Sequence, residues 1–421
     1  MQLPRLLPAL GLVQILSWGS LYYSLAVLAA PLRAELGFSE LTVFGAFTLG
    51  MLLSGALAPT VGRWIDARGG RLPLTLGSVL AALAFALLAL SHGVLSYYAG
   101  WLLAGAAMAL CLYEPAFAAL HRLAPARYRH SVTVLTLFGG FASTVFWPLS
   151  QRVLSEYGWR ETFALFAVLH LLIGVPVHAL LLPKEAPAAG VLPSGNDQSL
   201  KNCPVQNNSL QNDTRQHEIQ TAETQQTEIQ QTETQQASTP PHRAKLFWLA
   251  TAFSAATMVF AVLSVFLIEA LGQRGFAAAD AVWIAAAIGP LQVLGRLLEW
   301  RFAGQVRAVT VGSFAMLGLL LAMLLLSTMP AWWLTGLLFA ALYGMANGVM
   351  TVVRSAAPVE LFGPANVGTL LGRLARPNFI AKALAPALFA ALLLAGMSLQ
   401  VALYLLIGLA LLAWGAYRRV R

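Results

Sequence analysis

Apolar segments long enough to cross a lipid bilayer recur along the whole chain, and this feature limits the possible folds more than any other. A helix needs about 20 consecutive, mostly apolar residues to span a hydrocarbon core of roughly 30 Å. The segments between breakers predict helices over residues 6–32, 41–62, 72–91, 95–120, 131–154 and 160–182, and again over 246–271, 280–298, 308–328, 331–358, 367–393 and 396–416. We therefore expect an all-α membrane protein with twelve transmembrane helices in two six-helix halves.

The charged residues support this expectation and predict an orientation. Only 10% of the 421 residues are charged, whereas soluble domains carry about 25%. The net charge of +9 could suggest nucleic-acid binding, but no basic stripe studded with aromatic residues is present. Instead, the basic residues concentrate in alternate short loops: Arg63, Arg68, Arg71, Arg122, Arg127, Arg129, Arg301, Arg307, Arg418, Arg419 and Arg421. This positive-inside bias predicts cytoplasmic N- and C-termini in a bacterial-type inner (plasma) membrane, with the lipid bilayer as a partner and nucleic acid excluded.

A polar stretch divides the two sets of helices. Residues 183–245 are rich in Gln, Thr, Asn, Glu and Ser and have almost no apolar content. Such a composition cannot offset the entropy lost on ordering, so a disordered cytoplasmic linker is expected between an N-terminal half (1–182) and a C-terminal half (246–421). Cys111 falls within an expected helix and Cys203 within this linker, which predicts no disulfide. No cleavable signal peptide is expected, because the first apolar run is too long.

The two halves resemble each other in sequence. Gly62-Arg63 with Asp66 and Arg68 recurs as Gly295-Arg296 with Glu299 and Arg301, each time after the second helix of a half. Residues 105–125 align without gaps on 344–364, and 141–148 on 379–386. Parallel repeats of this kind are typical of transporters whose halves rock about a shared central site.

The loop after the second helix resembles the loop motif of the major facilitator superfamily, through Gly62, Asp66, Gly69, Gly70 and Arg71. The resemblance covers essentially the whole chain outside the linker. Residues 22–24, 31–32 and 35–39 resemble the monocarboxylate and oxalate/formate porter branch. The resemblance implies the twelve-helix facilitator fold, in which Gly62 allows close helix packing while Asp66 and Arg71 hold one conformation. The corresponding conformational motif comprises Gly62, Asp66, Arg68, Gly69, Arg71, Gly295, Arg296, Glu299 and Arg301.

Ionisable residues deep in a membrane are costly and indicate function. Lys382 lies about 15 residues, or roughly 22 Å, from the expected cytoplasmic end of its helix, too far for its stem to reach the interface. It therefore needs water, a carboxylate or an anionic substrate. Asn378 lies one turn earlier on the same face. In the resembled branch a lysine of this helix binds the substrate carboxylate; the alternative is a structural lysine bonded to backbone carbonyls. The branch's arginine before the second-half glycine is absent here, where Leu291 and Gln292 stand.

Glu114 and Arg354 lie in aligned helices of the two halves. We hypothesise that they pair as an intracellular gate, loosened when Glu114 is protonated. Breaking such a buried pair typically costs several kcal/mol. The alternative is that Arg354 extends to the interface and Glu114 meets a loop arginine such as Arg122. Asn347 lies on nearly the same face as Arg354 and is assigned with it to the substrate site.

Other candidates are weaker. Gln14, Trp18 and Tyr22 recur at four-residue spacing, which suits a cavity wall, although aromatic stripes in membrane helices often serve packing. His170 could relay protons, whereas His178 is expected to be structural.

These patterns predict a secondary transporter that works by alternating access. The excess of intramembrane cations favours a small carboxylate-like organic anion as substrate, with proton coupling. The alternative is an efflux antiporter for amphiphilic drugs or metabolites. A nucleotide-binding loop, a His-Glu-x-x-His motif and a paired aspartate motif are all absent from the sequence. We expect no enzymatic activity, no cofactor and no metal, and a monomer would suffice.

Overall fold

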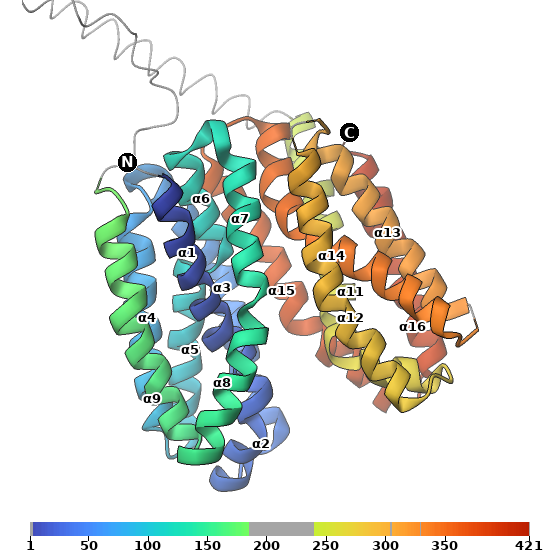
Figure 1. Cartoon of the computed structure of the whole chain (residues 1–421), viewed down its shortest axis with the longest axis horizontal. Coiled ribbons are helices and arrows are strands. Elements are labelled where there is room, and N and C mark those ends of the chain that lie inside the picture. The colour runs from blue at the N-terminus through green and yellow to red at the C-terminus, as the bar shows by residue number, and fades with distance from the viewer. Residues whose placement is uncertain (1–2, 185–239, 304, 329, 421) are drawn as a thin grey trace, which may run out of the picture.

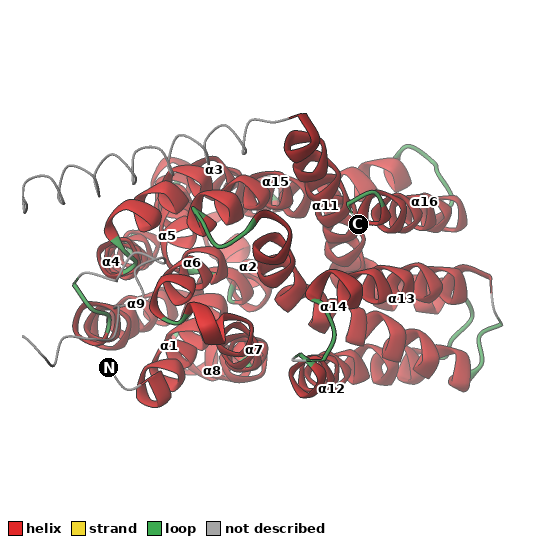
Figure 2. Cartoon of the chain, turned by 90° about the horizontal axis from the view of Figure 1, so that it is seen from above, coloured by secondary structure: helices red, strands yellow, loops and turns green. Residues whose placement is uncertain are grey.

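The structure is a computed structural model that describes residues 3–184, 240–303, 305–328 and 330–420. Within these ranges the secondary structure is entirely helical (Figure 2). The described residues contain twelve helical spans that are long and apolar enough to cross a membrane. All twelve predicted segments are thereby confirmed. Most of the predicted linker lies outside the described residues.

The N-terminal half contains six spans built from short and long helices. They are α1 (Leu3–Trp18), the π-helix η1 (Gly19–Tyr23), α2 (Leu25–Leu36), α3 (Glu40–Arg68), α4 (Arg71–Ala89), α5 (Val94–Cys111), α6 (Tyr113–Leu123), η2 (Pro125–Arg127), α7 (Tyr128–Gly140), α8 (Ala142–Tyr157), α9 (Trp159–Leu169) and the π-helices η3 (His170–Gly174) and η4 (Val177–Leu181).

The C-terminal half has one continuous helix for each span. These are α11 (Pro240–Gln273), α12 (Ala278–Phe302), α13 (Ala308–Thr328), α14 (Trp333–Phe362), α15 (Val367–Leu394) and α16 (Leu399–Arg418). Helix α11 begins at Pro240, before its predicted start at residue 246. Proline is favoured in the first turn of a helix, where its missing N–H has no intrahelical partner, so the Pro240-Pro241 pair suits this earlier start.

The fourth span is broken where its counterpart in the other half is not. Helix α5 ends at Leu112, whose backbone is extended (φ −78°, ψ −160°), and α6 follows. Pro115 lacks the N–H that a continuous helix would direct to the carbonyl of Cys111. The aligned residue of the second half is Arg354, which keeps its N–H, and α14 runs through this position unbroken. The break places Glu114 in the first turn of α6.

The two halves form separate bundles that lie side by side, with both termini at the same end of the molecule (Figure 1). We call this end the terminal face. The bundles approach each other near the terminal face and diverge toward the opposite end (Figure 1). Helix α15 of the second half packs along α3 of the first, and its Ala375, Phe379 and Ala383 join the hydrophobic core of the N-terminal half. The α3–α15 seam is therefore the main contact between the halves.

Candidate functional site

Lys382 reaches from α15 into the N-terminal half and lies against aromatic rings. Its ammonium nitrogen is 3.7 Å from the ring centroid of Tyr22 and 4.7 Å from that of Trp18. Both distances fall within the range of cation–π attraction, which contributes about 2 kcal/mol when the pair is desolvated. Lys382 makes no ion pair or hydrogen bond to a side chain or carbonyl in the described part of the chain. Its three N–H donors are thus not committed to protein acceptors there.

The rings around Lys382 form what we call the aromatic wall: Trp18, Tyr22, Tyr23 and Tyr113. The centroid of Trp18 lies 5.5 Å from Tyr22, 6.5 Å from Tyr23 and 4.8 Å from Tyr113. Tyr22 and Tyr23 belong to the π-helix η1, and their ring centroids lie 5.1 Å apart. Single π-turns inside membrane helices frequently mark functional sites. The indole nitrogen of Trp18 is buried and has no hydrogen-bond partner among the described residues.

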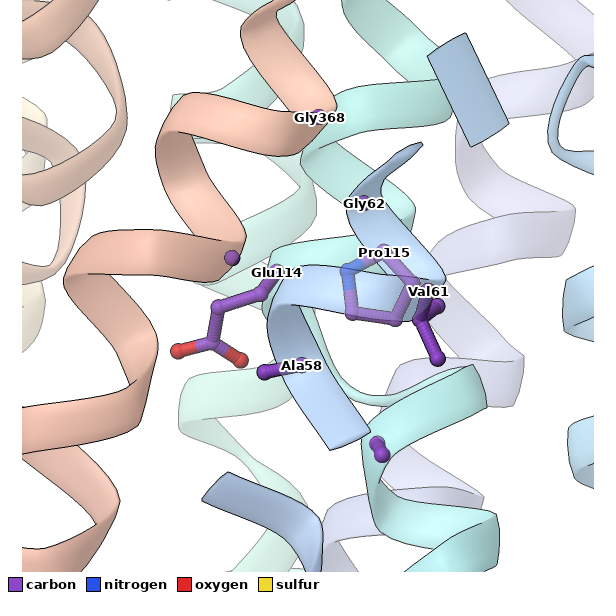
Figure 3. A pocket seen from close by; sticks show the side chains of 8 residues that line it. Ala58, Val61, Gly62, Glu114, Pro115 and Gly368 are labelled. Carbon is purple, nitrogen blue, oxygen red and sulfur yellow. The ribbon is translucent and has the colours of Figure 1, made fainter. Parts of the chain in front are cut away.

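Glu114 lines a small cavity behind the α3–α15 seam. The cavity holds about 10 Å³ and is lined by residues of α3, α5, α6 and α15, which include Ala58, Gly62, Glu114 and Gly368. A space of this size admits about one water molecule. In Figure 3 the Glu114 carboxylate points away from Pro115 and Val61, toward the ribbon of α15. Its Oε2 is buried and has no hydrogen-bond partner within the described ranges.

Glu114 interacts electrostatically with both Lys382 and Arg354. No ion pair within 4 Å joins it to either cation in the described part of the chain. The direct Glu114–Arg354 pair of the gate hypothesis is therefore not formed here. Arg122, the other partner considered for Glu114, donates instead to the backbone carbonyl of Asp66.

Arg354 belongs to a small polar network inside the C-terminal half. Its Nη2 donates to the hydroxyl of Thr257 on α11 at 2.7 Å, and that hydroxyl lies 3.3 Å from Oδ1 of Asn378. The network joins Arg354 to the residue one turn before Lys382. For Asn347 only the backbone carbonyl bonds, accepting from Thr351 at 3.1 Å. Arg354 and Asn378 thus join Lys382, Trp18 and Tyr22 near α15, while the Asn347 side chain makes no hydrogen bond to another described residue.

Gln14 satisfies the backbone carbonyl that the helix break at Leu112 leaves without a helical donor. Its Nε2 donates at 2.9 Å to the carbonyl of Cys111, the group left without a helical donor by Pro115. The side chain is 1% exposed, and its Oε1 has no partner among described residues. This contact gives Gln14 a structural task, which the four-residue stripe in the sequence does not distinguish from a cavity-wall position.

Asp66 crosses between the halves and caps a helix. Its Oδ1 accepts from the backbone N–H of Gly368 at 2.7 Å, and its Oδ2 accepts from the N–H and the hydroxyl of Thr369 at 2.6 and 2.7 Å. These are the first N–H groups of α15, where a carboxylate is stabilised by the helix dipole. Gly62 makes this approach possible, because a Cβ there would overlap the carbonyl of Gly368.

The second-half motif makes a different cross-half contact. Glu299 on α12 accepts from Nε of Arg129 at 2.6 Å and from the hydroxyl of Thr133 at 2.9 Å, both on α7. The Glu299 side chain is only 1% exposed. The Arg129 guanidinium also donates to the carbonyls of Ala303 and Val306 at 2.7 and 2.6 Å. A buried charge-assisted contact therefore joins the halves on the α7–α12 side.

Arg296 lies beside this pair and is also buried, with 5% of its surface exposed. Its Nη1 donates to the carbonyl of Thr136 across the interface at 2.9 Å. Gly295 serves packing inside the second half, since a Cβ there would lie 2.8 Å from the carbonyl of Met345 on α14. Gly62 and Gly295 are aligned in the repeat, yet only Gly62 lies at the contact between halves.

The remaining residues of the conformational motif make fewer contacts with other residues. Gly69 ends α3 with φ +78°, a conformation that favours glycine. Arg68 and Arg301 are exposed, and the Arg301 guanidinium lies 5.7 Å from the ring centroid of Phe302. Arg71 is partly buried, and its side chain makes no hydrogen bond or ion pair to another described residue. Within the described ranges, neither the Arg68 nor the Arg71 side chain makes a polar contact across the halves.

The two histidines are buried in hydrogen-bonded pairs within the first half. Nε2 of His170 is 2.9 Å from the hydroxyl of Ser20, and Nδ1 of His178 is 3.0 Å from that of Ser78. His170 also stacks on Phe85. These contacts are those expected of structural histidines. No group of three His, Cys, Asp or Glu side chains that could hold a metal ion occurs in the described residues.

Sequence reasoning missed several residues of this site: Arg129, Thr133, Thr257 and Tyr113. Arg129 was interpreted only as a topology signal, because a loop arginine and a buried partner look alike in sequence. Tyr113 directly precedes Glu114 at the helix break, and that proximity was the available signal. Thr257 is one hydroxyl in an apolar helix and carries no pattern of its own.

Residues 10–341 match the sequence profile of the Major Facilitator Superfamily. The chain is 33% identical over 141 residues to human monocarboxylate transporter 11, which covers 33% of this chain and 29% of that protein. It is 31% identical over 186 residues to a candidate sugar efflux transporter of Deinococcus radiodurans, covering 39% of this chain and 47% of the relative. The matched segments thus span less than half of either curated relative.

Solved structures match over nearly the whole chain. The proton:xylose symporter XylE has a TM-score of 0.67 at 15% identity, covering 98% of this chain and 95% of its own. FucP in the outward conformation has a TM-score of 0.70 at 11% identity, covering 100% and 99%. The human organic anion transporter MFSD10 has a TM-score of 0.65 at 19% identity, covering 99% and 100%. At these identities the likeness establishes a shared fold.

Proposed function

The chain belongs to the major facilitator superfamily of membrane transporters, and from this premise we propose that it carries a small carboxylate-like organic anion by gradient-driven alternating access. The observation that carries the proposal is Lys382. An ammonium within a membrane-spanning helix needs a compensating charge or acceptor, and in the described part of the chain the direct contacts of Lys382 are the faces of Trp18 and Tyr22. Its donors are available to a substrate carboxylate.

The balance of charge around Lys382 supports an anionic substrate. Lys382 and Arg354 interact electrostatically with a single carboxylate, that of Glu114. One anion cannot neutralise two cations, and a substrate carboxylate would supply the missing charge. The Asn378 amide and the Arg354 guanidinium, linked through Thr257, offer further hydrogen-bond donors near the same helix. The aromatic wall would contact the apolar body of the substrate.

Glu114 is our candidate for proton coupling. Glu114 borders a small cavity at the seam between the halves, and its carboxylate points toward α15, the helix that carries Lys382 (Figure 3). Protonation would remove the negative charge facing Lys382 and Arg354, and so would change their attraction for a substrate anion. In this proposal Glu114 does not form an ion pair with Arg354 as a gate. Instead, the Glu114 carboxylate and the substrate anion compete for the same two cations, Lys382 and Arg354.

The cross-half contacts would set the conformational cycle. Asp66 on the α15 N-terminus and the Arg129–Glu299 pair hold the terminal face closed, and both must break for the opposite state. With the termini in the cytoplasm of a bacterial-type cell, this state is closed to the cytoplasm. We propose the inner (plasma) membrane as its location, a monomer as the working unit, and no enzymatic role.

A second candidate is efflux of amphiphilic compounds. The aromatic wall favours it, because such rings bind apolar bodies of either charge. The partial likeness to a candidate sugar efflux transporter points in the same direction. The two candidates differ in what Lys382 does: an anion carrier depends on its charge, whereas export of a neutral or cationic compound is unchanged or improved without it.

Transport in proteoliposomes tests the proposal. A panel of labelled mono- and dicarboxylates would be assayed with and without an imposed proton gradient, for the wild type, Lys382→Ala and the control Lys245→Ala. Lys245 is an exposed lysine near the start of α11. We expect gradient-dependent uptake of at least one acid, lost in Lys382→Ala and kept in the control. Uptake that survives in Lys382→Ala would refute the anion site, and absence of uptake for every acid would favour efflux.

A further inference from the structure

Arg296 is a buried cation whose hydrogen bonds all go to uncharged acceptors. Nη1 donates to the Thr136 carbonyl at 2.9 Å, Nε to the Gly348 carbonyl at 3.4 Å, and Nη2 to the Thr351 hydroxyl at 3.5 Å. No carboxylate lies within ion-pair distance of it in the described residues. Burying an arginine without a carboxylate partner is costly, so its position calls for a reason other than charge pairing.

The position of the Thr136 carbonyl supplies that reason. Thr136 lies in α7, four residues before its last residue, Gly140, and the single residue Phe141 (φ −86°, ψ 0°) separates α7 from α8. A guanidinium bonded to the Thr136 carbonyl ties α7 of the first half to α12 of the second, close to this kink. Arg296 thus joins the halves from the second half, as Asp66 does from the first.

The fit around the guanidinium depends on glycine. A Cβ at Gly140 would overlap Nη1 of Arg296, so the guanidinium can reach α7 only because residue 140 has no side chain. Gly140 has a negative φ, and alanine is therefore compatible with its backbone. This makes Gly140 a position at which one added methyl group displaces Arg296 while the arginine itself is kept.

The same break in α7 contacts the aromatic wall. Gly139, next to Gly140, lies directly against the hydroxyl of Tyr113, since a Cβ at Gly139 would overlap that oxygen. Tyr113 in turn lies 4.8 Å, between ring centroids, from Trp18, whose ring contacts Lys382. Arg296 also interacts electrostatically with Tyr113 and Tyr23. The aromatic wall and Arg296 therefore contact two adjacent residues of α7, Gly139 and Gly140.

We propose that Arg296 is a positioning residue that couples occupancy of the aromatic wall to closure between the two halves, by binding the Thr136 carbonyl of α7 in the closed state only. A ligand pressing on Tyr113 acts on Gly139 and so on the Thr136 carbonyl, the group of α7 that Arg296 binds. When the halves part at the terminal face, the guanidinium leaves α7. This inference rests on the alternating-access transport proposed above, but its first test needs no substrate.

The test compares conformational populations in lipid nanodiscs. Nitroxide labels at Ala126 and Gln305, exposed in the two halves at the terminal face, report open and closed states by double electron–electron resonance in a background with Cys203→Ser. The variants are Gly140→Ala, Arg296→Gln and Arg296→Lys. The control is Gly408→Ala, a helical glycine with open space around its Cβ position. Because hydrogen bonds from a charged donor are among the stronger ones, we expect the open-to-closed ratio to rise about tenfold or more in Gly140→Ala and Arg296→Gln.

Two readouts separate the proposed role from general damage to the fold. Arg296→Lys keeps the charge and should restore part of the closed population. For any acid that the proteoliposome panel shows to be transported, Arg296→Gln should lower the maximal rate with little change in KM, whereas Lys382→Ala should abolish uptake. Ratios within twofold of Gly408→Ala in both Gly140→Ala and Arg296→Gln would overturn the proposal. So would a rise in KM for Arg296→Gln at an unchanged maximal rate, because that result makes Arg296 a binding residue.

Discussion

Replacing Asp66 by asparagine should open the terminal face, and the size of the effect follows from the contacts of the carboxylate. Its two oxygens accept three donors: the N–H groups of Gly368 and Thr369 and the Thr369 hydroxyl. The amide of asparagine offers one acceptor oxygen and turns an NH₂ group toward the remaining donors. At least one backbone N–H at the start of α15 is then left unsatisfied.

The loss can be estimated from two contributions. An unsatisfied, partly buried donor costs about 1–3 kcal/mol, and loss of the negative charge at the helix N-terminus costs about 0.3–1 kcal/mol more. A total of about 1.3–4 kcal/mol corresponds to a roughly 10- to 700-fold change in the closed-to-open ratio, at about 1.4 kcal/mol per factor of ten. The contacts of Asp66 with Gly368 and Thr369 join the two halves. Their loss therefore destabilises the closed state and not the fold of either bundle.

The spin-label pair at Ala126 and Gln305 measures this ratio directly. The matched control is Glu161→Gln, which neutralises an exposed carboxylate in the first turn of α9 within the same half. We expect a clear gain of the open state for Asp66→Asn, with thermal stability close to that of the control. An unchanged ratio would refute the reasoning that this carboxylate holds the halves together, and a large loss of thermal stability would show that it stabilises a bundle instead.

Two further predictions concern contacts that the structure reveals. Gln14→Leu should lower the free energy of unfolding by about 1–3 kcal/mol, because the Cys111 carbonyl loses its donor. The loss should be smaller in a Pro115→Ala background, where the backbone N–H of the alanine can donate to that carbonyl. Equal losses in both backgrounds would contradict this reasoning. Arg129→Met should raise the open-to-closed ratio, because it leaves buried Glu299 unpaired in the closed state at a cost of about 3–5 kcal/mol, and adding Glu299→Gln should recover part of it. The spin-label ratio of all four combinations measures that coupling, and strictly additive effects would argue against a functional pair.

The sequence pointed to Lys382, which carries the proposed substrate site, and to Trp18 and Tyr22, whose rings it contacts, but not to the contacts among these residues. An ionisable residue in an apolar helix is visible in a sequence because its cost does not depend on neighbours, and this selected Lys382, Arg354 and Glu114. Which of them touch depends on the register of α3, α6, α14 and α15 against one another. The hypothesised Glu114–Arg354 ion pair is absent among the described contacts, because Arg354 donates instead to Thr257. Thr257 lies on α11, a helix that the alignment of the two halves does not relate to Arg354.

The sequence alone determined the twelve spans, the division into halves and the motif at the end of α3, because each depends on local composition or spacing. Without water in the bilayer core, a spanning segment must satisfy its backbone groups inside the protein, which a helix does almost entirely within its own segment, so hydropathy is enough to locate helices. Which residues join the halves was decided only by tertiary structure. Arg129 and Arg296 find their partners on helices more than 150 residues away in the chain (|i−j| of 170 and 160), and only the packing of two bundles brings such groups together.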